Sequence, residues 1–114
     1  SVLLLGDTGE DAQRTLLRYE GRIQADVVKV AHHGSRDQHD ALTQQLGARW
    51  ALVSVGADNS YGHPASSTLA GLNEAGAHIL RTDRHGSIAL VPQPDGALQP
   101  WVQHAATREP EPTP

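Results

Sequence analysis

The chain contains no cysteine, no methionine and no phenylalanine, and its only aromatic residues are two Trp and two Tyr. Without cysteine it forms neither disulfides nor thiolate metal sites. Its core must be built from Leu, Val, Ile and Ala, because aromatic side chains are so few. A natural chain begins with methionine, so we expect this sequence to be a piece of a longer protein.

Long apolar runs and excess positive charge are missing as well. No apolar run approaches the roughly 20 residues that a membrane-spanning helix requires. The formal net charge is −4, so no general positive field attracts nucleic acid. Any polyanion must be held by local groups or by a metal ion. The length of 114 residues is enough for one domain with its own core.

Short strand-like stretches alternate with helix-like stretches along the chain. We expect strands at 2–6, 27–30, 50–55 and 78–81, and helices at 10–19, 37–46 and 66–75. This alternation predicts an α/β fold with right-handed crossovers. We also expect a mixed sheet with a terminal antiparallel hairpin. In that prediction 87–91 pairs back onto the fourth strand through a tight turn at 83–86.

Residues capable of chemistry follow the first two expected strands. Asp7 follows the first strand, and His32 and His33 follow the second. Neighbouring parallel strands lie about 4.8 Å apart, so these side chains can converge on one ion. A carboxylate with a neutral imidazole suits Zn²⁺, Mn²⁺ or Fe²⁺. Adjacent residues leaving a strand point in opposite directions, so we expect one histidine to face metal and the other the substrate.

Simpler roles explain the same residues when each is considered alone. Asp7 can cap the helix that follows it, and the two histidines can be solvated loop residues. Gly34 permits close approach of a ligand to the backbone, and Ser35 can donate a hydrogen bond to an oxyanion. In the loop after the third strand, His63 can ligate metal, donate a proton or bind a phosphate oxygen. A plain turn with an exposed histidine explains this loop equally.

Taken together, four stretches resemble the metallo-β-lactamase-fold domain of the ComEC family, the DNA-uptake channel proteins of competent bacteria. They are residues 3–7, which end in Gly-Asp, 25–35, which end in His-His-Gly-Ser, 54–64, which end in Tyr-Gly-His-Pro, and 80–83. The resemblance covers about residues 2–92 and implies the C-terminal half of an αββα sandwich. On this basis residues 1–103 form a partial domain that lacks its N-terminal half, and 104–114 form a disordered tail.

The resemblance also implies roles for individual residues. Asp7 would bridge two divalent metal ions, zinc or manganese, and His33 would bind one of them. These two residues would be catalytic in hydrolysing a phosphodiester through a metal-bound hydroxide. His32, Ser35 and His63 would contact the substrate, which in the family is the DNA strand that is not taken up.

The His-x-His-x-Asp-His type of motif that characterises the superfamily is absent from these residues. We therefore expect this chain alone to be inactive, to bind metal weakly and to self-associate through an exposed sheet face. The implied setting is a soluble domain of a bacterial inner-membrane protein. Its partners would be single-stranded DNA, the remainder of its own membrane-channel polypeptide and other competence proteins. Two alternatives are another hydrolase of the superfamily, lactonase-like or phosphorylcholine-esterase-like, and a non-catalytic α/β interaction module.

Overall fold

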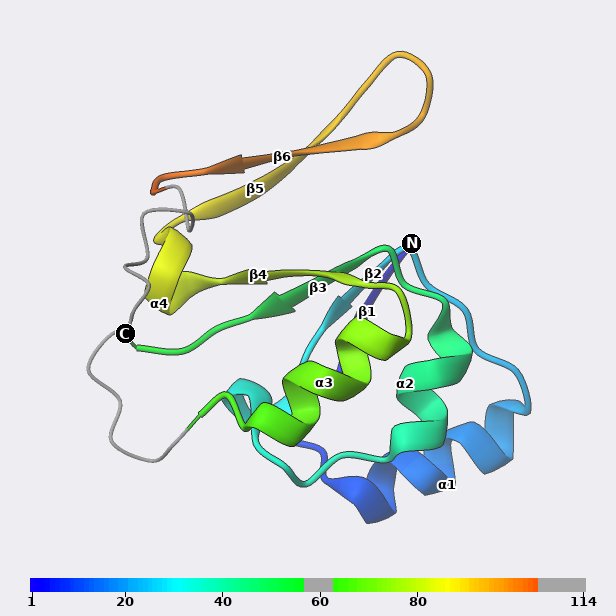
Figure 1. Cartoon of the computed structure of the whole chain (residues 1–114). Coiled ribbons are helices and arrows are strands. Elements are labelled where there is room, and N and C mark those ends of the chain that lie inside the picture. The colour runs from blue at the N-terminus through cyan, green and yellow to red at the C-terminus, as the bar shows by residue number, and fades with distance from the viewer. Residues whose placement is uncertain (57–62, 105–114) are drawn as a thin grey trace.

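A computed structural model describes residues 1–56 and 63–104 of the chain. Its centre is a parallel sheet with the strand order β1-β2-β3-β4 (Figure 1). The four strands are β1 (Val2–Leu4), β2 (Val27–Lys29), β3 (Trp50–Val53) and β4 (His78–Arg81). Each strand pairs in parallel with the next one along the chain, so every connection must cross back over the sheet.

Three helices make these crossings, and all of them lie on one face of the sheet (Figure 1). They are α1 (Glu10–Glu20), α2 (Asp40–Leu46) and α3 (Ser66–Glu74). Right-handed crossovers between consecutive neighbours put every helix on the same side. Gly21 and Gly47 end the first two helices with positive φ angles of 73° and 63°, as their place in the sequence predicts.

The core lies between the helices and the sheet face that they cover. Alternate strand residues point into it, and Leu42, Leu46 and Leu72 meet them from the helices. The buried core residues that lie in or just after the strands are Leu5, Val28, Val30, Ala51, Val53 and Val55. The side chains of Val2 and Leu4 have the opposite direction and are 61% and 73% exposed.

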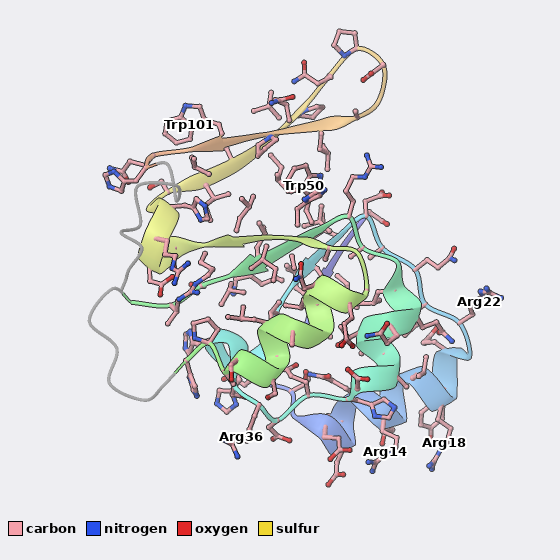
Figure 2. The ribbon with its side chains drawn as sticks, viewed as in Figure 1. Arg14, Arg18, Arg22, Arg36, Trp50 and Trp101 are labelled. Atoms are coloured by element: carbon pink, nitrogen blue, oxygen red, sulfur yellow. The ribbon has the colours of Figure 1, made fainter. Side chains whose placement is uncertain are left out.

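A separate hairpin lies over the other face of the sheet (Figure 1). Its strands β5 (Ile88–Pro92) and β6 (Leu98–Val102) pair only with each other in the part of the chain described. Trp50 lies between the sheet and this hairpin, whereas Trp101 points outward (Figure 2). The hairpin therefore covers part of the face that the helices leave open.

The expected mixed sheet is wrong, because the main sheet is entirely parallel and the hairpin is a sheet of its own. The expected tight turn is instead a short helix, α4 (Thr82–His85). The Gly86 N–H donates to the Thr82 carbonyl and closes this helical turn. The Arg81 N–H also donates to His85 Nδ1, at 2.9 Å. This turn leads the chain away from β4, so β5 does not pair with it.

Two further sequence predictions fall mostly outside the described residues. These are the loop residues 57–62 and the tail from residue 105 onward. The extent of the partial domain, residues 1–103, stays a prediction. Among the helices of residues 1–56 and 63–104, none is long and apolar enough to cross a membrane.

Candidate functional site

The segment after β2 is a tight turn, η1 (Ala31–Gly34), which holds both adjacent histidines. His32 and His33 have left-handed φ angles of 53° and 55°, and Gly34 continues the turn at 80°. Such angles are uncommon for residues other than glycine and often mark functional positions. Because the two histidines have left a strand geometry, strand alternation does not set their directions. Both side chains are exposed.

The end of β1 is joined to this turn through the backbone. The His32 N–H donates to the Gly6 carbonyl at 2.8 Å, so Asp7 lies on the loop next to the histidines. Asp7 is exposed. It does not cap α1: the N-cap residue is Gly9, and the carboxylate that accepts from the Glu10 N–H is that of Asp37, at 3.0 Å. The structure thus brings the Gly-Asp motif next to the His-His motif, at the carboxyl ends of the neighbouring strands β1 and β2.

The ring of His33 is oriented by the segment that follows β3. Its Nδ1 lies 2.6 Å from the Ser54 carbonyl oxygen. A carbonyl only accepts hydrogen bonds, so Nδ1 is the donor in this contact, and in the neutral ring the lone pair is then on Nε2. Metal-binding histidines in proteins usually have this arrangement, in which one ring nitrogen donates to a backbone carbonyl and the other binds the ion.

The third motif packs against the same turn. The Ala65 N–H donates to the Gly34 carbonyl at 2.8 Å. A Cβ added to Gly34 would lie 2.6 Å from Pro64 Cβ, so only glycine permits this approach. His63, which is partly buried, is therefore held close to η1, and its peptide bond to Pro64 is cis.

Ser35 lies below the turn and is 8% exposed. Its Oγ accepts a hydrogen bond from the Asp37 N–H at 3.3 Å, and its carbonyl accepts one from Thr68 Oγ1 at 2.7 Å. The Thr68 contact anchors the end of η1 to α3. The hydroxyl hydrogen of Ser35 is not used in either bond, so it is available to an acceptor.

Two glutamine residues that sequence reasoning missed, Gln13, which is buried, and Gln38, which is half-buried, connect the loops from beneath. Gln13 is 1% exposed, and its Nε2 donates to the Thr8 carbonyl at 3.1 Å and to Gln38 Oε1 at 2.9 Å. Gln38 Nε2 in turn donates to the carbonyls of Ala31 and Ser35, both at 3.0 Å. One signal was present in the sequence: Gln13 precedes Leu16 and Leu17 by three and four positions, which puts it on the apolar face of α1.

The donor set suits a borderline metal ion, since it combines the Asp7 carboxylate with the Nε2 lone pair of His33. Within residues 1–56 and 63–104, no three His, Asp or Glu side chains form a group that could hold an ion. Two ligands from this part of the chain are fewer than the three or four that such ions usually take from a protein. Further ligands would have to come from elsewhere.

Sequence comparison relates the chain to two competence proteins. It is 36% identical over 89 residues to "ComE operon protein 3" of Bacillus subtilis (strain 168), covering 77% of this chain and 12% of that protein. It is 27% identical over 90 residues to "Competence protein ComA" of Neisseria gonorrhoeae, covering 77% of this chain and 13% of that protein. The chain therefore spans about an eighth of the length of these curated relatives. No family model and no solved structure matches it. The two similarities support a competence-related protein family.

Proposed function

We propose that this chain is part of a metal-dependent phosphodiesterase or nuclease domain that acts on DNA during competence-related DNA uptake. The observation that carries the proposal is the convergence of two loops, joined by the 2.8 Å bond from the His32 N–H to the Gly6 carbonyl. That bond brings a carboxylate and an oriented imidazole to one edge of the sheet. The similarity to "ComE operon protein 3" and to "Competence protein ComA" supports a competence-related role, and DNA is the substrate that such a role would imply.

In this proposal the Asp7 carboxylate and His33 Nε2 would be the residues of this chain that hold divalent ions, zinc or manganese. When bound, the ions would supply a hydroxide nucleophile at neutral pH and stabilise negative charge on the phosphate oxygens. The chain itself holds the two ligands in place through the Gly6 and Ser54 carbonyls.

Substrate contacts in the proposal come from around the same turn. His32 is exposed beside the proposed ligand and would bind a phosphate oxygen. His63 would contact the substrate from the side of α3, since the Ala65–Gly34 bond holds the neighbouring chain against η1. Ser35 would donate its hydroxyl hydrogen to an oxyanion, a role for which its Oγ–Asp37 contact leaves the hydrogen available.

The sheet face opposite the helices supports the further proposal that a second layer of chain packs there, as in an αββα sandwich. Val2 and Leu4 present apolar side chains on that face. Within the described residues, Trp50 Nε1 is a buried donor with no hydrogen-bond partner, and Trp50 faces the same way. A buried N–H without an acceptor is costly, so an added layer that supplies an acceptor would stabilise it. The missing ligands and this layer would both belong to the remainder of the polypeptide.

The proposal is tested by a DNA-cleavage assay on the longer polypeptide that contains this chain, with Mn²⁺ or Zn²⁺ and labelled DNA. We expect Asp7→Asn and His33→Ala to lower the cleavage rate by about a hundredfold or more, because each removes several kcal/mol of charge stabilisation. Asp95→Asn and His78→Ala, which change exposed residues away from the site, should cleave at the parent rate.

Cleavage by Asp7→Asn and His33→Ala at the parent rate would show that the site is assigned wrongly. A parent protein that hydrolyses lactones or phosphorylcholine esters but not DNA would place the chain with other hydrolases of the superfamily. A parent that binds its partners but hydrolyses none of these substrates would favour the interaction module.

A further inference from the structure

Thr82, the first residue of α4, makes two hydrogen bonds to the chain segment beyond β3. Its Oγ1 accepts from the Val55 N–H at 2.7 Å and donates to the Val55 carbonyl at 2.8 Å. Only a hydroxyl can do both with one atom. The neighbours of Thr82 are fixed in turn, because the Arg81 guanidinium donates to both carboxylate oxygens of Asp83 at 3.0 and 2.7 Å.

The Val55 N–H and the Ser54 carbonyl belong to the same peptide group. Thr82 holds this group by its N–H, and His33 Nδ1 donates to its oxygen at 2.6 Å. A peptide group is planar and its N–H and C=O point in opposite directions, so fixing one end fixes the other. The three residues therefore form one hydrogen-bonded chain across the ends of β2, β3 and β4.

We propose that Thr82 is a positioning residue that sets the orientation and tautomer of His33 through this single peptide group. Such chains of hydrogen bonds reinforce one another because each polarises the next. With Thr82 in place, the proton of neutral His33 is held on Nδ1 and the Nε2 lone pair is left for an ion. The inference rests on the proposed ligand role of His33 and names what orients that ligand.

The test is ¹⁵N NMR of the histidine rings in the full 114-residue chain, at a pH where His33 is neutral and without metal. The two ring nitrogens give separate signals that report which one is protonated. In the parent we expect His33 as the Nδ1–H tautomer. In Thr82→Val the ratio of the Nδ1–H to the Nε2–H tautomer should fall by roughly five- to tenfold, the effect of weakening about one hydrogen bond. Thr82→Ser keeps the hydroxyl and should restore the parent ratio.

The matched control is Thr68→Val, which removes another threonine hydroxyl close to the turn, the one that donates to the Ser35 carbonyl. It should leave the His33 tautomer unchanged. An equal change in Thr82→Val and Thr68→Val would overturn the proposal, and so would an Nε2–H tautomer in the parent. If Thr82→Val does not fold, an Nε2–H tautomer in the parent or a changed ratio in Thr82→Ser, which keeps the hydroxyl, would still overturn the proposal. Because no metal or DNA is needed, failure here is distinct from failure of the cleavage assay.

Discussion

Gln13 and Gln38 meet side chain to side chain beneath the candidate site, with 2.9 Å between Gln13 Nε2 and Gln38 Oε1. Gln13 also accepts from the His39 N–H at 2.8 Å through its Oε1. Gln38 donates to the carbonyls of Ala31 and Ser35, at the two ends of η1. The pair therefore connects the loop after β1 with both ends of η1. A buried amide and a half-buried one thus hold the two proposed ligand loops at a fixed separation.

Replacing Gln13 should therefore lower the free energy of unfolding more than replacing a glutamine at an exposed helix position does. Gln13→Leu leaves Gln38 Oε1 and the His39 N–H without their partner in a partly buried setting. We expect a loss of about 2–4 kcal/mol in the free energy of unfolding, measured by urea denaturation. Gln44→Leu, at an exposed position of α2, should cost about 1 kcal/mol or less. Equal losses for the two variants would mean that the Gln13–Gln38 pair is not a structural support.

Gly34 is the point where the turn of the two histidines touches the chain that follows His63. Gly34→Ala combines a left-handed φ of 80° with a Cβ placed 2.6 Å from Pro64 Cβ. We expect it to lower the free energy of unfolding by about 2–5 kcal/mol, from backbone strain and overpacking together.

Gly47→Ala separates these two causes. Gly47 has a φ of 63°, but an added Cβ there would meet open space. It should cost only about 1–2 kcal/mol, the backbone contribution alone. If thermal or urea unfolding gave the same loss for both variants, the contact between Gly34 and Pro64 would not be the reason for the glycine.

The exposed face of β1 predicts self-association of the isolated chain. In the part of the chain described, β1 pairs with β2 alone, so its other edge is open as well. Leu4→Lys places a charge on this face and should weaken association by roughly tenfold or more, because burying one Leu is worth about 1.5–3 kcal/mol. Analytical ultracentrifugation over a concentration series measures this change.

Trp101→Lys is the control for that experiment, since Trp101 is 54% exposed on the outward face of the hairpin. It should associate like the parent. A parent chain that sediments as a monomer at every concentration would contradict the prediction. Weakened association in Trp101→Lys rather than in Leu4→Lys would move the contact to the hairpin.

Local patterns in the sequence predicted most of the elements. Apolar β-branched runs such as Val27 to Val30 mark strands, and glycine stops such as Gly21 and Gly47 mark helix ends. The α/β class follows from their alternation. The turn at 83–86 was read as a hairpin because its composition suits one. One backbone bond, from the Gly86 N–H to the Thr82 carbonyl, and one bond from the Arg81 N–H to the His85 ring make it helical, and composition reveals neither.

The sequence predicts the candidate site only in outline. It shows that reactive residues follow neighbouring strands, whose carboxyl ends lie close together. The left-handed angles of His32 and His33 have no sequence signal, since glycine is the usual residue for such angles. The bonds from His33 to Ser54 and from Thr82 to Val55 join residues 21 and 27 positions apart. Contacts of that range follow from tertiary packing, so the sequence named the proposed ligand but not the groups that orient it.

The central claim is that Asp7 and His33 belong to one metal centre. It is tested most directly by titrating Mn²⁺ into the ¹⁵N-labelled chain and following paramagnetic broadening of the backbone signals. We predict that the signals of residues 6–8 and 32–34 broaden first and together, and that Asp7→Asn or His33→Ala removes the effect at both loops. Broadening that begins at other acidic residues, such as Glu74, while both loops stay sharp would contradict the claim. So would broadening at one loop that survives loss of the ligand on the other.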